Sequence, residues 1–406
     1  MKRKIFSIVL SVVAVLALFL SGAKANVNAA EKSAKKTTIQ LLVPGYEEGY
    51  LKEQLDSRIA LFEKKNPTIK VKIVSAGWDE LNEKIVQLYQ AKQAPDLMLV
   101  GSRSLRQFGE LGALEDLSTY MTKEKKDSYI KNVLATGQVD KKQFGLPMAL
   151  SSRCLFYRKD LIKEAPKTWE DLKKVAQEQT TDKQKGFAIP TDVTSGTDEI
   201  LNFIYQGGGQ IVDKKGDFVI NSKENIATLT YLVSLKKFIP DPVSTSRRDQ
   251  SKQFVNADLA MFISGGWEKE TMDKNQDKTP YATAFLPEGK KKGVTIVTDS
   301  YAMSSLSKHK KEAYKFLDFM SQLDNQKVVT AAYGWFPILK EESKDKKYSS
   351  DFNKPMYDII QYGTPEPQVP NWDEFNKSFI TAVQKALTGE ASPKEALDNC
   401  QKELTK

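Results

Sequence analysis

Segments with strand-like and helix-like patterns alternate along the part of the chain that follows an apolar N-terminal run. Short apolar runs predict strands at residues 38–43, 70–75 and 96–100. Amphipathic patterns predict the intervening helices at 50–65, which Asn66 and Pro67 end, and at 81–92. Because strands connected by helices pair in parallel, this alternation predicts an α/β fold with a largely parallel sheet.

A second pattern of the same kind follows a connector. Residues 144–162 are extended in character and interrupted by proline, and Thr168, with Asp171 three residues on, caps the start of a helix. Further elements are expected at 187–190, near 199–205, at 222–237 and at 259–263, with a glycine turn at 207–209. A chain of 406 residues is long enough for two such units, which predicts two α/β lobes.

The N-terminus has the pattern of an export signal. Lys2, Arg3 and Lys4 precede an apolar run at 5–20, and small residues follow at 21–25. A transmembrane anchor is the alternative, but the run is shorter than the ~20 apolar residues that span a bilayer. We therefore expect residues 1–30 to be a signal and a flexible N-terminus. The mature protein is then extracellular or associated with the envelope of a bacterium, and periplasmic in a Gram-negative one.

Leu20-Ser21-Gly22-Ala23 resembles the lipobox of bacterial lipoproteins, except that Ala23 stands where the lipidated cysteine would be. Without that thiol no acyl anchor forms at this position. Two accounts stay open from the sequence: cleavage after Ala25 or a nearby alanine, and loss of the cysteine from a lipoprotein ancestor.

Charge and cysteine content exclude several classes of partner. The formal net charge is +9, but four cations and no acid lie in the first 25 residues, so the rest of the chain carries +5. Short lysine clusters flanked by acids are typical of a solvated surface, so we expect no nucleic-acid partner. With only Cys154, Cys400 and one histidine, His309, we expect no metal. The two cysteines are more often unpaired at this separation, although the sequence leaves a single disulfide open.

Seven motifs occur in an order that is similar to one known family. They are "NPTIKVKI", "APDLMLV", "FGLPMALSSRCLFYRKDL", "PKTWEDL", "GGG", "FVNADLAMFISGGWE" and "EPQVPNWDEFNKSFITAVQKALTGEASPKEALD". Each motif is weak alone, but their order and spacing over nearly the whole mature chain resemble the family-1 extracellular solute-binding proteins. These are the maltose-binding-like receptors of ABC importers.

The resemblance implies a periplasmic-binding-protein-like fold of two hinged lobes that close on a sugar held in the cleft between them. Each lobe would be a mostly parallel sheet flanked by helices. The chain would cross between lobes near 147–151, near 295–299 and after about Leu339, which gives lobe I as 37–148 plus 299–340 and lobe II as 149–298 plus 341–406. The implied partners are a carbohydrate and the permease subunits of an importer with a separate ATPase, and we expect a monomer.

Trp267 is the most specific binding candidate. It follows the predicted strand at 259–263, and Gly265 and Gly266 leave space beside its indole. A pyranose has an apolar face of C–H bonds and an edge of hydroxyls, so its site needs an aromatic platform and a few oriented polar groups. Packing within a lobe is the alternative. The place of Trp267 at a strand end, together with the family motif, favours the platform.

Other candidates also follow predicted strands. Tyr46 and Glu48 come after the first strand, and Trp78 comes after the second. Arg103 comes after the third strand and can donate to two vicinal hydroxyls. The alternatives are a solvated loop for the first two, packing for Trp78 and a surface ion pair for Arg103.

Ser151 and Asp299 lie at the predicted crossings. Several relatives have a carboxylate where Ser151 stands, with Arg153 close by, and some have an Asp-Arg pair in place of Arg103-Ser104, so the sugar of the best-known members is not implied. Asp299 can accept protons from two hydroxyls, or brace the hinge instead.

Three further tryptophans differ in their surroundings. Trp335 and Trp372 fall in loops bounded by glycine or proline, which favours the cleft for both. Trp169 lies at the start of its predicted helix and is expected to pack against its own lobe.

An enzyme is the main alternative of another class. No Gly-x-Ser-x-Gly, His-Glu-x-x-His or Walker-type run is present, and the glycine turn at 207–209 lacks the spacing of a dinucleotide loop, so we expect no cofactor. A glycoside hydrolase with two carboxylates stays open, because its acids need only converge in space. A binding protein of the same fold for a non-sugar solute also stays open.

Overall fold

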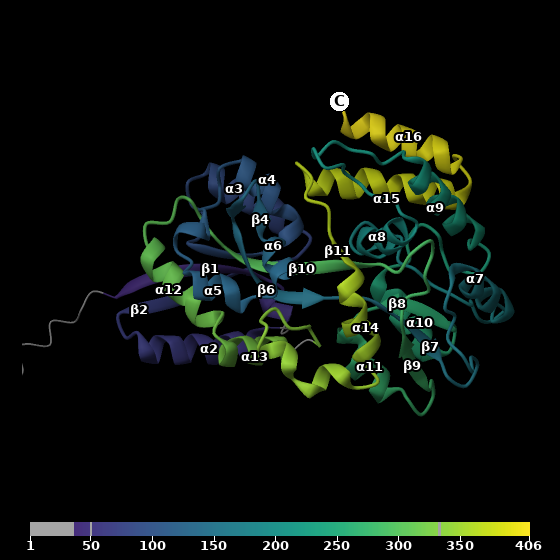
Figure 1. Cartoon of the computed structure of the whole chain (residues 1–406), viewed down its shortest axis with the longest axis horizontal. Coiled ribbons are helices and arrows are strands. Elements are labelled where there is room, and N and C mark those ends of the chain that lie inside the picture. Colours follow the sequence, from purple (N-terminus) through teal and green to yellow (C-terminus); the bar gives the residue numbers. More distant parts are fainter. Residues whose placement is uncertain (1–35, 49–50, 332–333) are drawn as a thin grey trace, which may run out of the picture.

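The computed structural model describes residues 36–48, 51–331 and 334–406, apart from the side chain of Glu48. Two lobes lie side by side, each with its own sheet and helices (Figure 1). The predicted two-lobed α/β fold is therefore confirmed. The predicted export signal and the lipobox-like segment lie outside the described residues. In the described ranges, no helix is both long enough and apolar enough to cross a membrane.

The first lobe is built on a six-stranded sheet. Its strands are β1 (Thr37–Pro44), β2 (Ile69–Ala76), β3 (Leu97–Gly101), β6 (Gly145–Ser151), β10 (Val294–Met303) and β11 (Gly363–Pro365). β1 pairs in parallel with β2 and with β3, as predicted, whereas β10 runs antiparallel to β3 and to β6. Gly101, the last residue of β3, lies opposite Asp299 in the middle of β10.

Helices cover both faces of this sheet. They are α2 (Lys52–Lys65), α3 (Leu81–Gln90), α4 (Leu105–Glu110), α5 (Lys123–Ser128), α6 (Lys131–Ala135), α12 (Lys310–Met320) and α13 (Leu323–Ala331). Leu41 of β1 packs in the core that contains α2 and α12, and the next residue, Leu42, packs in the core that contains α3 and α4. Burial of alternate residues on both faces explains why the predicted strands are continuous apolar runs. A short hairpin joins β4 (Gln138–Val139) and β5 (Lys142–Gln143).

The second lobe contains a three-stranded sheet of β7 (Cys154–Arg158), β8 (Met261–Ser264) and β9 (Tyr281–Ala284). Both pairings of β7 are antiparallel, so the expectation of a mostly parallel sheet was wrong for this lobe. The stretch at 187–190, where an element was expected, makes one bridge, from Ala188 to Phe262, and that bridge is parallel. Pro190, which has no N–H to donate, ends that stretch.

Long helices surround this smaller sheet. They are α7 (Trp169–Glu178), α8 (Gly196–Gln206), α9 (Lys223–Ser234), α10 (Arg247–Asn256), α11 (Lys269–Lys274), α15 (Trp372–Thr388) and α16 (Pro393–Leu404), and α14 (Lys354–Asp358) lies in the connection that leads to them. The predicted start of α7 is confirmed, since Thr168 and Asp171 form a reciprocal capping box. Trp169 packs inside the lobe as predicted and stacks on Tyr231 with ring centroids 4.5 Å apart.

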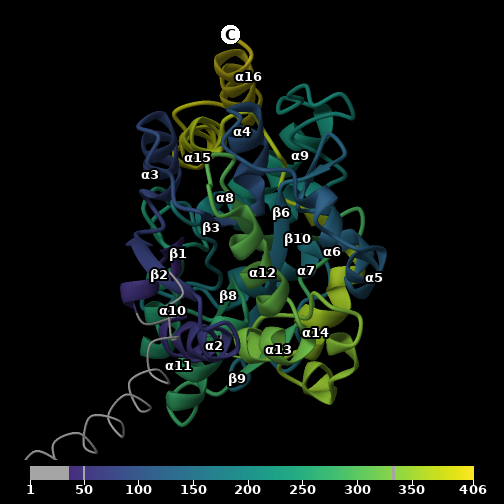
Figure 2. The ribbon, with the colours of Figure 1, turned by 90° about the vertical axis from the view of Figure 1, so that its left-hand side faces the viewer.

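β6, β10 and the segment that ends in β11 connect the lobes. β10 pairs with β3 over Asp299–Met303 and with β11 over Val294–Ile296, and β6 continues into β7 after two residues. β6 and β10 extend side by side between the two lobes, in opposite directions (Figure 1). The view turned by 90° shows α15 and α16 at one end of the molecule and α2, α11 and α13 toward the other (Figure 2). The lobe limits given by residue number stay predictions.

Candidate functional site

Trp267 lies just beyond β8, in the short 3-10 helix Gly266–Glu268. Its indole folds back over Gly265, where an added Cβ would lie 2.2 Å from Cζ3 of the ring. A side chain at position 265 would therefore displace the indole. This close approach is the reason for glycine at position 265, as the sequence indicated.

Two arginines lie over the Trp267 ring. The guanidinium carbon of Arg153, which follows β6, is 4.8 Å from the ring centroid, and that of Arg247, the first residue of α10, is 5.2 Å away. Both arginines bond to Glu199 of α8, with N···O distances of 2.7 Å. Asp198 lies 3.8 Å from each of them. Cation–π contacts and ion pairs thus join four charged side chains to one indole.

Arg103 reaches across the junction between the lobes. Its Nη1 donates to Oε1 of Glu366 at 3.0 Å, and its guanidinium carbon lies 5.0 Å from the ring centroid of Trp372. The Glu366 side chain is almost fully buried, whereas that of Arg103 keeps 23% of its surface exposed. A second contact between lobes joins Asn82 of α3 to Asp373 of α15 at 3.0 Å. Arg103 is therefore held by the second-lobe side of the site while it stays accessible.

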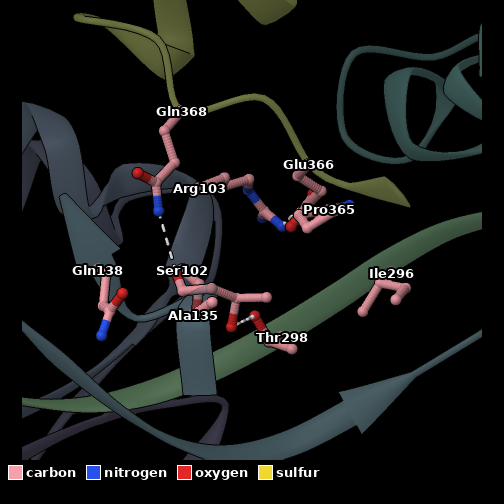
Figure 3. A pocket seen from close by; sticks show the side chains of 10 residues that line it. Ser102, Arg103, Ala135, Gln138, Ile296, Thr298, Pro365, Glu366 and Gln368 are labelled. Carbon is pink, nitrogen blue, oxygen red and sulfur yellow. Dashed lines mark hydrogen bonds and ion pairs between the residues drawn. The ribbon is translucent and has the colours of Figure 1, made fainter. Parts of the chain in front are cut away.

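β10 separates two polar regions. Successive residues of a strand point to opposite faces, so Thr298 and Asp299 diverge. Thr298 lines a cavity of about 210 Å³ at the junction, and its hydroxyl bonds to that of Thr136 at 2.8 Å (Figure 3). Gln138, Gln368 and the Arg103–Glu366 pair line the same cavity. Arg103 belongs to both polar regions. It lines the cavity beside Thr298, and its charge also acts on Asp299.

Burial and charge separate the pKa values of the carboxyls at this junction. Burial raises the pKa of Asp299 to about 6, against the opposing effect of Arg103. Burial also raises the pKa of Glu366 well above its usual range, and Glu366 shares a hydrogen bond with Asp198. For Asp198, burial acts in the same direction, but three arginines outweigh it and hold the pKa below its usual value. The pKa values of Glu366 and Asp198 are therefore shifted in opposite directions.

We expect replacement of Asp299 by asparagine to stabilise the folded protein at neutral pH. The folded pKa of Asp299, about 6, exceeds the ~3.9 of an unfolded aspartate, so its contribution to the free energy of unfolding is complete below about pH 4 and is lost as the pH rises through 6. Asparagine imitates the neutral form, so the gain should be on the order of 2 kcal/mol at about pH 7.5 and close to zero at about pH 4. Urea unfolding at both pH values measures it, and an equal effect at both would contradict the assignment.

The structure brings four of the predicted site residues together. Arg103, Ser151, Trp267 and Asp299 belong to the cluster; the Ser151 hydroxyl accepts a hydrogen bond from Arg153 at 3.3 Å. Trp372 joins them through its ring contact with Arg103, but the expected loop was wrong, because Trp372 is the first residue of α15 and is 4% exposed. Asn371 caps this helix, a signal that the sequence contained.

The other predicted residues lie elsewhere or are not described. The Tyr46 hydroxyl bonds to Asp56 of α2 at 2.5 Å, and Lys52 lies over its ring, so Tyr46 is buried against its own lobe. The side chain of Glu48 lies outside the described residues. Trp78 is 38% exposed after β2, and Trp335 is half-buried against the first-lobe core.

Sequence reasoning missed Asp198, Glu199, Arg247 and Glu366. Asp198 and Glu199 lie in the first turn of α8, and Arg247 follows the helix cap Ser246, so each resembles an ordinary helix-end charge in the sequence. Glu366 is the first residue of the last of the seven motifs, and nothing in its sequence neighbourhood indicates that it is buried. The available signal was in α8, where Asp198 and Glu199 stand in the first turn of a helix that is otherwise largely apolar. Acidic residues in such a helix are expected to have buried partners. Among the described residues, no group of three His, Cys, Asp or Glu side chains could hold a metal ion.

A model of the bacterial extracellular solute-binding protein family matches residues 45–327. The chain belongs to this family. It is 26% identical over 402 residues to the maltodextrin-binding protein MdxE of Bacillus subtilis (strain 168), an alignment that covers 93% of this chain and 91% of the relative. It is 25% identical to the galactooligosaccharide-binding protein of the same organism, with 84% and 83% covered.

A solved ABC substrate-binding protein shares the fold. An ABC substrate-binding protein of Listeria monocytogenes in complex with cycloalternan superimposes with a TM-score of 0.79 at 24% identity, over 91% of this chain and 98% of that one. The family assignment predicted from seven ordered motifs is confirmed. Both the family and these neighbours are binding proteins, described by their ligands and not by a reaction.

Proposed function

We propose that this protein is an exported receptor that binds a saccharide between its two lobes and delivers it to the permease of an ABC importer. The observation that carries the proposal is the charged cluster of Arg103, Asp198 and Asp299 at the strands that connect the lobes, which Arg153 joins to the indole of Trp267. An indole beside charged donors and acceptors suits the two surfaces of a pyranose. The names of the similar maltodextrin- and galactooligosaccharide-binding proteins support this ligand class.

The proposed roles follow from chemistry. Trp267 stacks on the C–H face of a sugar ring, Arg103 donates to hydroxyls, and Asp198 and Asp299 accept from them. Ser151 adds a hydroxyl at the first crossing, and Trp372 supports Arg103 from the second lobe. Trp78 and Trp335 are placed at the rim of the cleft, and Glu48 stays a candidate beside them.

The proposed partners lie at the membrane. A receptor of this family that holds no nucleotide site delivers its ligand to permease subunits, and a separate ATPase supplies the energy. The protein acts as a monomer outside the cytoplasm, and it catalyses no reaction on its ligand. Closure of the lobes on the ligand fixes the bound state.

A hydrolase of saccharides is the second candidate, and one observation favours it. The carboxyls of Asp198 and Asp299 have their pKa values moved in opposite directions, as a general acid and its partner carboxylate would need. Incubation with labelled oligosaccharides distinguishes the two. Recovery of intact ligand in stoichiometric complex supports the receptor, and turnover supports the enzyme.

A screen of mono- and oligosaccharides by thermal shift tests the proposed function. A ligand at 100 times its Kd should add about 2.7 kcal/mol to the stability of the folded state. Small-angle scattering with the saccharide that is found should give a smaller radius of gyration than without it. If no saccharide of any length shifts the unfolding temperature, and an amino acid, peptide or other solute does, the ligand class is wrong.

A further inference from the structure

Trp267 has polar neighbours that a core tryptophan would not have. Arg153 and Arg247 lie over its ring at 4.8 and 5.2 Å from the centroid. The Arg153 side chain is 2% exposed, and the Arg247 side chain is 25% exposed. Two cations that both lie close to one ring would repel each other unless an anion lay between them. The positions of Arg153 and Arg247 therefore depend on the anion that they share.

That partner is Glu199, whose carboxylate is completely buried. Nε of Arg153 donates to both carboxylate oxygens, at 2.7 and 2.9 Å. Nε and Nη2 of Arg247 both donate to Oε1, at 3.1 and 2.7 Å. Asn202, one turn later on α8, donates to the other oxygen of Glu199 at 3.4 Å. Oε1 of Glu199 thus bonds both guanidinium groups directly, whereas Asp198 lies 3.8 Å from each.

Shared bonding to one oxygen keeps the two arginines together. Two groups that each bond one acceptor have guanidinium carbons within about 7 Å of each other. Both guanidinium carbons also lie close to the Trp267 ring, at 4.8 and 5.2 Å from its centroid. A change at Glu199 therefore acts on both ring contacts at once.

We propose that Glu199 is a positioning residue: through Arg153 and Arg247 it holds the Trp267 indole in the orientation in which it meets the sugar ring. The sugar in this proposal depends on the proposed function. The role of Glu199 in orienting the indole does not depend on it. Gly265 takes part in the same arrangement, because the ring can fold against the turn only where position 265 has no side chain. The position of the Trp267 indole thus depends on the charge of Glu199 in α8 and on the absence of a side chain at Gly265, just after β8.

Glu199→Gln tests the proposal, since it keeps the shape of the side chain and removes its charge. The glutamine keeps one acceptor oxygen, but it replaces the other by a donor NH2 group and removes the negative charge between the two cations. The arginines should therefore separate, and the indole should lose its fixed orientation. We expect an affinity for the identified saccharide about five- to fiftyfold weaker. We also expect a changed emission of Trp267 in the ligand-free protein, obtained as the difference between each protein and its Trp267→Phe variant.

The matched control is Glu342→Gln, which neutralises another completely buried glutamate, one bonded to the backbone N–H of Ile338 in the 336–342 segment. It should lower stability and leave the Trp267 emission unchanged. If Glu199→Gln fails to fold, Arg247→Met replaces it, because Arg247 is partly exposed and Arg153 continues to pair with Glu199.

The two readouts separate this proposal from the proposed function. A changed Trp267 emission without binding of any saccharide would keep the positioning role and refute the ligand class. An unchanged emission and an unchanged affinity, in a folded Glu199→Gln or Arg247→Met protein, would refute the positioning role alone.

Discussion

Trp267→Ala is expected to weaken saccharide binding by about ten- to a thousandfold, or on the order of 1 to 4 kcal/mol, in a protein that still folds. The indole is partly buried and contacts a glycine and two arginines, and it belongs to none of the three apolar cores of the described residues. Its removal takes away the apolar platform and opens the charged cluster to water. It does not leave a sealed cavity, whose cost would fall on stability.

Calorimetric titration and urea unfolding of the same variant measure the two effects separately. The matched control is Trp169→Ala, since Trp169 is buried in the second-lobe core, where its indole N–H bonds to Gln206 at 2.8 Å. That control should lower the free energy of unfolding by roughly 3 to 5 kcal/mol and leave the affinity of the folded fraction unchanged. Unaltered affinity in folded Trp267→Ala protein would refute the stacking role.

The sequence predicts the local elements of this protein well. The strands and helices from β1 to β3 agree with their predictions within three residues, because their signals are local: apolar runs for buried strands, and the break at Asn66-Pro67 for α2. Thr168 and Asp171 are a further case, since both partners of the capping box lie in one turn. Pairing partners of the second sheet were not predictable in this way, because β7 pairs with strands more than 100 residues away.

The residues of the candidate site also differ in whether a local sequence signal identifies them. Trp267 and Arg103 were predictable as candidates because each follows a strand, and ligands of α/β folds bind beyond strand ends. Glu199 and Arg247 were not, because neither sequence neighbourhood shows that their helices, 48 residues apart in the chain, meet at one oxygen. Tyr46 shows the converse error: it follows a strand, but Asp56 ten residues later holds its hydroxyl against α2.

The buried ion pair of Arg153 and Glu199 is expected to contribute strongly to the stability of the folded protein. Arg153→Met is expected to lower the free energy of unfolding by about 3 kcal/mol, at the lower end of the range for breaking a buried ion pair. The loss leaves Glu199, which is 0% exposed, with Arg247 as its remaining cation, and that surviving bond at 2.7 Å is the reason for the lower end. The Met side chain fills most of the arginine's volume, so the measured effect reports charge and not a cavity.

Urea unfolding against Arg158→Met gives the matched comparison. Arg158 is a nearly buried arginine of the same lobe, but its partner Asp160 is 38% exposed and can return to water when the cation is lost. We therefore expect Arg158→Met to cost less than Arg153→Met. A double variant, Arg153→Met with Glu199→Leu, should be less destabilised than the sum of the two single variants, because it removes both charges of the pair together. Additive effects in that cycle would show that Glu199 is stabilised by Arg247 alone, and that Arg153 contributes only by packing on the Trp267 ring.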